Sequence, residues 1–384
     1  MNADVGLVNT ALGDIAKAFP NVDPTLISMV STLPVLFMIP CTFIAGKLSQ
    51  MYSKKTILIY SLMIYIIGGV GSTFVSNTIY QLLFMRALVG IGAGLSAPLS
   101  GSIIAALYEG NERAMMLGLS NAFTSAMAVV TTMLAGWLCV INWKYTFLAY
   151  AIFLLVLILE LLALPSIPPE KVYKESSGES ERRQIGWQVI GRYFTLALFT
   201  FACLIAGMLM MIKLAIYVMN EGIGNAVTTA TAMSANTVAA FISSVLFAYI
   251  YRIFKRYTLV IFTVFTMLAY ILLLNAHSAS AVTFAMFVNG FGMGLFMPSL
   301  QLRASQIGTK DTTTFAMSFI MGAMFFGQFM ASFVEKILAL FGNLSIKALF
   351  TLGAICFAVY TAIYIIWVIM HPEKNVAAEG QYTA

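Results

Sequence analysis

The chain has 384 residues, of which 60% are apolar and only 9% carry a charge. A soluble domain carries about 25% charged residues, so this composition excludes an ordinary soluble protein and indicates a chain solvated mainly by lipid. The formal net charge of +6 at pH 7 could suit a nucleic acid or a membrane surface, and the distribution of the basic residues decides for the membrane.

Apolar stretches long enough to cross a bilayer follow one another along the chain. A helical span needs about 20 apolar residues. We expect eleven complete spans, at about residues 26–46, 57–77, 80–107, 114–140, 145–164, 193–219, 226–251, 258–276, 280–302, 313–334 and 347–370. A closed barrel is excluded because its segments would be short and alternating.

Residues 1–19 have the pattern of the outer part of one more helix, but they are too few to cross. Asp4, Asn9, Asp14 and Lys17 lie there among apolar residues. The repeat described below has a shift near 200, which predicts a first helix that begins before Met1. The expected fold is therefore an all-α membrane protein of two six-helix bundles related by a pseudo-twofold axis, with the first helix N-terminally truncated.

The repeat depends on a glycine-rich stretch in each half of the chain. Five residues of 90–98 recur in 290–298 at a shift of 200. They are Gly90, Gly92, Gly94, Leu95 and Pro98, against Gly290, Gly292, Gly294, Leu295 and Pro298. A phosphate-binding loop would need a preceding strand in a βαβ unit, which the pattern does not provide. We expect these glycines to let helices pack closely, with each proline loosening its helix.

The basic residues divide the chain and orient it. We expect an N-terminal half at 1–164, a cytoplasmic linker at 165–192, a C-terminal half at 193–370 and a cytoplasmic tail at 371–384. Loops on one side hold fifteen lysines and arginines and loops on the other hold four. By the positive-inside rule the first side is cytoplasmic. This places both termini in the cytoplasm and the chain in the plasma membrane.

Two basic residues lie inside predicted spans. A guanidinium in the bilayer costs at least ~2.5–3.5 kcal/mol on insertion scales, so Arg86 needs a partner, and Asp4 and Asp14 are the available acids. Two interpretations stay open for Arg86, a fixed ion pair that holds the first half together and a role in proton or substrate coupling. Lys213 either extends toward its helix end or meets Asp14 across the halves as an outer gate.

These features resemble the major facilitator superfamily over essentially the whole chain. Residues 4–12 resemble the first-helix pattern of the family, and Arg86 with Gly90 and Gly94 resembles a fourth-helix motif whose arginine is implicated in proton coupling in drug antiporters. Residues 46–55 resemble the signature loop after the second helix. There Gln50 replaces the acid and Ser53 the turn glycine, while Lys54 and Lys55 keep the basic pair.

The resemblance implies a secondary transporter that works by alternating access. We expect proton-coupled export of a small amphipathic solute, with Asp4 as the protonatable carboxylate and Arg86 biasing its charge state. The family's cavity helices here supply Asp4, Asn9, Arg86, Tyr217 and Asn289. The gating candidates are Asp14, Lys213, Gln50, Lys54 and Lys55.

Two alternatives remain. One is uptake of a small polar or anionic nutrient by a symporter or facilitator, with Arg86 or Lys213 as anion ligands. The other is a membrane enzyme or a non-transporting sensor, which is disfavoured because His277 and His371 have no metal spacing and no nucleophile and base pair is apparent. The expected partners are a small-molecule substrate, protons and lipid, with no nucleic acid, metal or cofactor, and we expect a monomer.

Overall fold

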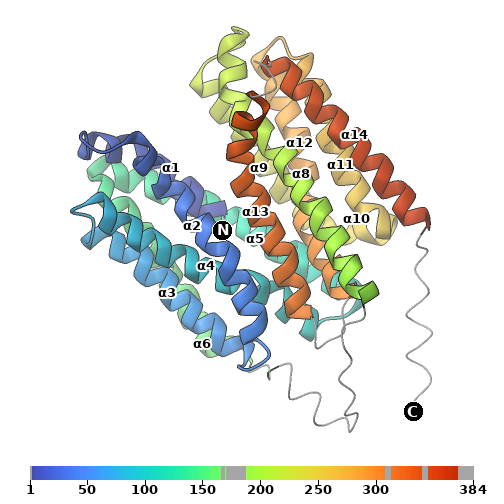
Figure 1. Ribbon diagram of the computed structural model, residues 1–384, viewed down its shortest axis with the longest axis horizontal. Coiled ribbons are helices and arrows are strands. Elements are labelled where there is room, and N and C mark those ends of the chain that lie inside the picture. The colour runs from blue at the N-terminus through green and yellow to red at the C-terminus, as the bar shows by residue number, and fades with distance from the viewer. Residues whose placement is uncertain (1, 166–168, 170–186, 308–312, 340–344, 371–384) are drawn as a thin grey trace.

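The computed structural model describes residues 2–165, 169, 187–307, 313–339 and 345–370, and these are almost entirely helical (Figure 1). The first half contains α1 (Asn2–Ala18), α2 (Pro24–Leu48), α3 (Lys54–Phe74), α4 (Ile79–Leu107), α5 (Gly110–Ile141), the 3₁₀ segment η1 (Trp143–Ala151) and α6 (Ile152–Ala163). The second half contains α8 (Trp187–Asn220), α9 (Ala226–Val245), α10 (Phe247–Phe254), the 3₁₀ turn η2 (Lys255–Tyr257), α11 (Thr258–Leu274), α12 (Ala279–Ile307), α13 (Thr313–Ala339) and α14 (Ile346–Met370).

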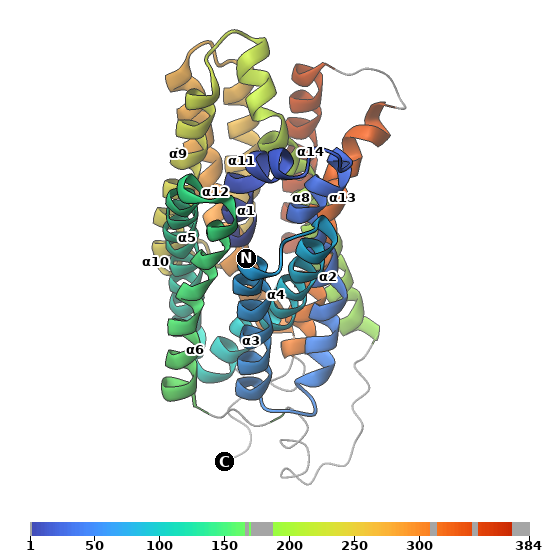
Figure 2. The ribbon, with the colours of Figure 1, turned by 90° about the vertical axis from the view of Figure 1, so that its left-hand side faces the viewer.

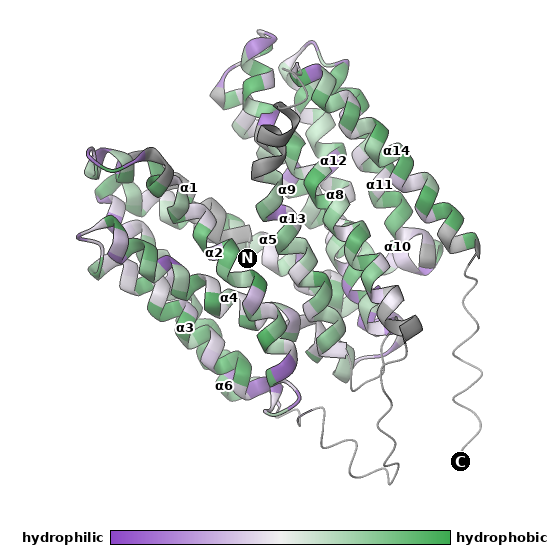
Figure 3. Cartoon of the chain, viewed as in Figure 1, coloured by the Kyte–Doolittle hydropathy of each residue, from purple (hydrophilic) through white to green (hydrophobic). Residues whose placement is uncertain are grey.

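The predicted spans are confirmed by the helices. By length and hydropathy, nine helices of the described part are able to cross a membrane, or ten when the bent pair α9 and α10 counts as one span. The shorter apolar helix α11 corresponds to the remaining predicted stretch, at 258–276. Apolar residues cover the length of these helices and polar ones gather toward the ends and loops (Figure 3).

Two elements differ from the prediction. The span expected at 226–251 is bent by 61° between α9 and α10. Ser243 and Ser244 precede the bend, and the Ser244 hydroxyl donates to the Gly294 carbonyl of α12 at 2.8 Å. The Ser243 hydroxyl donates to the Ala240 carbonyl, one turn back in α9, at 3.2 Å, and serine hydroxyls bonded back to their own helix in this way often bend it. The second difference is that α8 begins at Trp187, so the end of the expected linker is helical, whereas most of the linker and the whole expected tail lie outside the described residues.

The glycine repeat produces the same packing in both halves. A Cβ atom built on Gly90 or Gly94 would lie within 3 Å of α2 backbone atoms, and one on Gly92 would meet the α3 backbone at 2.5 Å. Gly290 and Gly294 face α9 in the same way, and Gly292 faces α11. Small residues therefore let α4 lie between α2 and α3, and α12 between α9 and α11, as close helix packing in lipid requires. Pro98 and Pro298 lie inside continuous helices, and the loosening expected at each proline stays a prediction.

A second contact repeats with its residue types exchanged. In the first half, Gly69 of α3 lies against the ring of Tyr150 in η1, and in the second half Tyr270 of α11 lies against Gly353 of α14. Both tyrosines are fully buried. In each half, a tyrosine ring packed against a glycine thus joins the third span to the last one. The tyrosine comes from the last span in the first half and from the third span in the second half. This exchange keeps the volume at the contact nearly constant, which close packing demands.

The two ends of the bundle differ in charge. We call the end that carries Lys47, Lys54, Lys55, Arg113, Arg252, Lys255 and Arg303 the basic end. The opposite end carries the loops at 19–23, 75–78, 221–225 and 275–278. In Figure 1 the two halves lie against one another around α5 and α13, and the loops of the opposite end are drawn apart. Figure 2, which has the first half toward the viewer, shows the same two groups of helices.

Candidate functional site at the junction of the two halves

The first part of the junction joins α2 to α13 near the basic end. A Cβ atom on Gly46 would lie 2.6 Å from the Ser318 hydroxyl oxygen, and one on Gly322 would lie 2.6 Å from the ring of Phe43. The Phe43 ring also meets Phe319 edge to face, with ring centroids 6.1 Å apart. Each helix therefore has a glycine against which a side chain of the other helix packs, and the two halves approach closely here.

The second part joins α5 to the second half. A Cβ atom on Gly118 would lie 2.7 Å from the Ser244 carbonyl oxygen and 2.9 Å from the Cβ of Phe247. One turn further along α5, the Asn121 side-chain amide donates to the side-chain oxygen of Gln301 in α12 at 3.0 Å. Neutral hydrogen bonds of this kind between membrane helices contribute about 0.6 kcal/mol each. They fix the alignment of the halves without preventing their separation.

Arg113 connects the same two halves at the end of the bundle. Its guanidinium donates to the Tyr108 carbonyl at 2.8 Å and to the Ala105 carbonyl at 2.9 Å, at the C-terminal end of α4. A cation is favourable there because the helix dipole is negative at its C-terminus. Its remaining terminal nitrogen donates to the Ser305 hydroxyl of α12 at 3.3 Å. The arginine therefore ties α4, α5 and α12 together.

Toward the middle of the bundle the junction becomes apolar. Met321 and Phe325 of α13 are both 2% exposed and belong to the core of the first half. Met297 of α12 packs against the cores of both halves. Methionine and phenylalanine thus form the surface on which the halves meet, and methionine adapts readily to different neighbours because its side chain is unbranched and polarizable.

Arg86 lies inside the first half. Its side chain is fully buried, its Nε donates to the Val30 carbonyl of α2 at 3.1 Å, and a terminal nitrogen donates to the Tyr150 hydroxyl of η1 at 2.7 Å. The guanidinium carbon also lies 5.7 Å from the centroid of the Tyr150 ring, within the range of a cation–π contact. These contacts join α4 to α2 and η1, so Arg86 is a fixed positive charge in the first half.

The acidic candidates of α1 are placed only in part. The side chains of Asp4 and Asn9 lie outside the described side chains. Asp14 accepts a hydrogen bond from Lys17, one turn further along α1, at 2.8 Å. In this structure Asp14 therefore pairs within its own helix. Lys213 is 8% exposed in α8, and its expected contact with Asp14 stays a prediction for a state closed at the opposite end.

The two polar candidates of the second half are both buried. The Tyr217 hydroxyl donates to the Leu273 carbonyl of α11 at 2.7 Å, and its ring lies 5.1 Å from that of Phe350 in α14. The assignment of Tyr217 to a substrate cavity is therefore wrong, because its side chain points into the core of its own half. Asn289 is 2% exposed in α12, and its role in a cavity stays a prediction.

The signature loop is organised mainly within the first half. The Lys55 ammonium donates to the Leu161 and Leu164 carbonyls at 3.0 and 2.7 Å, at the end of α6. It therefore caps a helix, which corrects its assignment to a gate between the halves. Ser53 caps the start of α3 by accepting the Thr56 N–H. The assignments of Lys54, which is 2% exposed, and of half-buried Gln50 to a gate stay predictions.

Sequence reasoning missed several residues of this arrangement. Asn121, Gln301 and Arg113 join the halves, and the signal for them is a polar amide or guanidinium within an otherwise apolar helix. Glu160 was also missed, although it is a carboxylate inside the stretch predicted at 145–164. Among the described residues its Oε2 atom is buried without a hydrogen-bond partner.

Comparison with known proteins agrees with this architecture. The profile of the family described as Major Facilitator Superfamily matches residues 1–332 and, in a second match, 214–383. The chain belongs to the Major Facilitator Superfamily. The solved structure of the fucose:proton symporter FucP from E. coli superposes with a TM-score of 0.73 at 16% identity, covering 95% of this chain and 96% of that one. At this identity the likeness concerns the fold.

Two curated relatives come from Bacillus subtilis (strain 168). The multidrug transporter protein MdtP is 27% identical over 139 residues, which are 35% of this chain and 26% of that protein. Multidrug resistance protein 3 is 28% identical over 145 residues, which are 38% of this chain and 28% of that protein. The matched segment thus spans about a quarter of each relative's length.

Proposed function

We propose that this transporter exports a small amphipathic solute in exchange for protons across the plasma membrane, with both termini in the cytoplasm. Membership of the superfamily supports transport, and two relatives that carry the name of multidrug proteins support export. Alternating access follows from two rigid halves that rock about a site near the middle of the membrane.

The observation that carries the proposal is the position of the junction. The contacts of Gly46 with Ser318, of Gly118 with Ser244 and of Asn121 with Gln301 all join the halves on the side of the basic end. The positive-inside rule assigns that end to the cytoplasm. The structure then corresponds to the state that is closed to the cytoplasm and accepts protons or solute from the outside.

The apolar middle of the junction supports an amphipathic solute. Met297, Met321 and Phe325 meet there, and methionine surfaces can repack around ligands of different shape. When the halves separate at the basic end, these side chains become the wall that a solute contacts. We expect specificity to come from shape and apolar area rather than from many directed hydrogen bonds.

Proton coupling is assigned to Asp4, with Arg86 as its electrostatic partner. Intramembrane carboxylates in transporters commonly mark proton pathways. Arg86 is held at a fixed place by Val30 and Tyr150, so it supplies a constant positive charge to the first half. A change of protonation at Asp4 then alters the net charge of that half and the balance between its two states.

The test uses the full chain in sealed vesicles of bacterial lipid with an imposed pH gradient. The probes are fluorescent amphipathic cations, and the readout is gradient-driven flux. Glu221→Gln is the matched control, because it removes a carboxylate outside the proposed machinery, one that pairs with Lys347 at 2.6 Å. We expect Asp4→Asn to abolish the response to the gradient and Glu221→Gln to retain it.

Unchanged gradient-driven flux in Asp4→Asn would remove Asp4 from the coupling role. A flux that ignores the gradient in the unmodified chain would favour a facilitator instead. The absence of flux for every amphipathic cation in the panel would count against export of this class of solute.

Uptake of a small polar or anionic nutrient is the second candidate. It is favoured by Lys213, a cation 8% exposed within α8, because a buried ammonium can bind an anionic group. Counterflow with labelled sugars and carboxylates separates the two candidates. Exchange of such a solute that is lost in Lys213→Gln would support uptake, and exchange that persists in this variant would exclude Lys213 as its ligand.

A further inference from the structure

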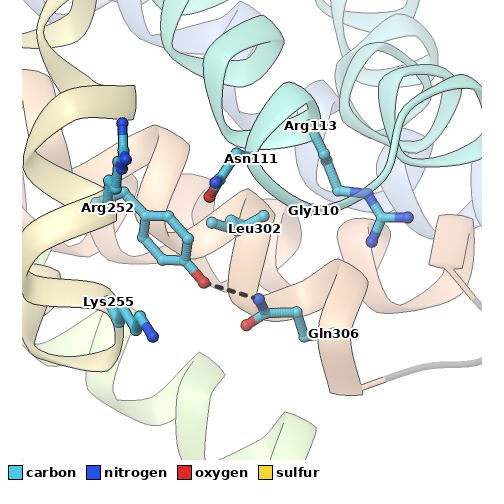
Figure 4. A pocket seen from close by; sticks show the side chains of 8 residues that line it. Gly110, Asn111, Arg113, Arg252, Lys255, Leu302 and Gln306 are labelled. Carbon is cyan, nitrogen blue, oxygen red and sulfur yellow. Dashed lines mark hydrogen bonds between the residues drawn. The ribbon is translucent and has the colours of Figure 1, made fainter. Parts of the chain in front are cut away.

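A cavity at the basic end lies between the two halves and is separate from the proposed solute pathway. Its volume is about 480 Å³. The polar and charged side chains that line it are Asn111, Arg113, Tyr251, Arg252, Lys255 and Gln306. Arg113 and Asn111 come from α5 in the first half, and the others come from α10, η2 and α12 in the second half. We call this cavity the basic pocket (Figure 4).

The charge of the basic pocket is positive. Three cations line it, and no carboxylate does. The nearest acids in sequence do not line the cavity, although Glu109 precedes Gly110 and Glu112 lies between Asn111 and Arg113. A concave surface of one charge focuses its potential and attracts counter-ions. The basic pocket therefore favours an anionic ligand.

Arg252 and Lys255 have their charged groups available for such a ligand. Both side chains are exposed, and in the described part of the chain neither forms an ion pair or a side-chain hydrogen bond. Arg113, by contrast, already donates to two carbonyls and to Ser305. In Figure 4, Arg252 and Lys255 stand on one side of the pocket and Arg113 on the other, with Asn111 and Gln306 between them.

Neutral donors complete the lining. The Gln306 amide donates to the Tyr251 hydroxyl at 3.0 Å, which leaves the hydroxyl hydrogen and the second amide hydrogen for a ligand. The first residues of α5 also line the pocket, and the residue before them, Glu109, makes no side-chain cap on the helix start. Free backbone N–H groups and the positive end of the helix dipole therefore add to the side-chain charges.

Phosphate is the anion that this set of donors suits best. Guanidinium groups bind phosphate oxygens in pairs, an ammonium adds a point charge, and helix N-termini and amides supply further donors. Lys255 has a left-handed backbone, with φ of +45°. Such strain in a residue other than glycine costs about 1–3 kcal/mol and tends to persist where it holds a functional side chain in place.

We propose that the basic pocket binds a phosphate-bearing anion and that binding favours the state closed at the basic end. The reason is geometric, since the walls of the pocket come from both halves and separate when the halves move apart. A ligand that binds one state better than the other shifts the population toward it. The same chemistry is available from the headgroup of an anionic lipid and from a soluble phosphate, and the experiment below separates these sources.

The test uses the full chain in nanodiscs, with the four natural cysteines replaced by alanine. Spin labels on Met51→Cys in the first half and Ile369→Cys in the second, which are 58% and 62% exposed, report the separation of the halves at the basic end. The nanodiscs contain phosphatidylcholine alone, phosphatidylcholine with phosphatidylglycerol, or phosphatidylcholine with inorganic phosphate in solution. Native mass spectrometry of the detergent-solubilised protein counts the retained phosphatidylglycerol or phosphate.

The variants are Arg252→Gln and Lys255→Gln, with Lys47→Gln as the matched control. Lys47 is an exposed cation of the same end that does not line the pocket. We expect phosphatidylglycerol or inorganic phosphate to raise the ratio of closed to open states about fivefold or more in the unmodified chain and in Lys47→Gln. Both pocket variants should lose this response together with the retained ligand.

A response to phosphatidylglycerol alone identifies the lipid headgroup, and a response to inorganic phosphate identifies the soluble source. The proposal is overturned if neither phosphatidylglycerol nor inorganic phosphate changes the ratio of closed to open states, or if the protein retains neither ligand. It is also overturned if the unmodified chain and the three variants respond alike. None of these readouts requires transport, so their failure leaves the proposed function standing.

Discussion

Gly118 offers the sharpest test of the junction between the halves. In Gly118→Ala the new Cβ would lie 2.7 Å from the Ser244 carbonyl oxygen and 2.9 Å from the Cβ of Phe247. Neither atom can be moved by rotating a flexible side chain, so the halves must separate at the basic end. Overpacking costs about 1–3 kcal/mol. Because each 1.4 kcal/mol is a factor of about ten, the ratio of closed to open states should fall by roughly 5- to 150-fold.

The same spin-label pair, Met51→Cys and Ile369→Cys, measures this ratio directly. The matched control is Gly136→Ala, because Gly136 lies in the same helix and a Cβ atom there would meet nothing within 4 Å. The control carries the same chemical change and the same gain in helix propensity. We expect its distance distribution to equal that of the parent chain.

The contact at Gly118 does not hold the basic end closed if Gly118→Ala and Gly136→Ala give the same distance distribution as the parent. The contact is also not the cause if both variants open the basic end to the same degree, since the effect would then come from the helix itself. A loss of folded protein in Gly118→Ala alone would show that the contact stabilises the fold rather than one of its states.

Three further predictions concern stability, each read from thermal unfolding in detergent. Gly290→Ala, whose Cβ would meet the Asn236 carbonyl of α9, should lose about 1–3 kcal/mol, and an unchanged midpoint would contradict the close packing of α12 on α9. Tyr150→Phe should lose about 1–3 kcal/mol because it removes an acceptor from the buried Arg86 guanidinium, whereas exposed Tyr145→Phe should be neutral. Lys55→Met should lose about 0.3–1 kcal/mol, because it removes the cation at the end of α6, and equal loss in Lys47→Met would refute this cause.

Hydropathy and the glycine repeat were enough to predict the spans and the close packing of α4 and α12. The reason is physical, since a backbone in lipid must satisfy its hydrogen bonds within helices. A helix that approaches another one closely also needs small residues at the contact. The positions of Gly90 and Gly290 therefore carry their structural meaning in the sequence itself.

Hydropathy and the glycine repeat did not predict which way single side chains point. Tyr217 was expected in a cavity and instead donates to Leu273 within its own half. In a lipid environment apolar residues cover both the packed and the lipid-facing sides, so periodicity does not fix the rotation of a helix as it does in water. Polar residues in the C-terminal part of α8 could thus be located along the helix but not around it.

Partners distant in sequence were missed for a related reason. Arg86 meets Tyr150, 64 residues away, and a tyrosine near a helix end also suits the membrane interface, where this residue type is common. Lys55 was expected to act between the halves because it belongs to a family loop. Its contact with Leu161 and Leu164 depends on the path of α6 beside α3, which no local pattern contains.

The most direct test of alternating access locks the basic end and measures flux. A Cβ atom on Gly46 would lie 3.1 Å from the Cβ of Ser318, a few tenths of an ångström below the separation that a disulfide requires. Gly46→Cys with Ser318→Cys, in a chain without its natural cysteines, should therefore cross-link on oxidation. We predict that solute flux in vesicles disappears on oxidation and returns on reduction, and that oxidation does not change the flux of either single variant. Full flux through the cross-linked protein would contradict alternating access between these two halves.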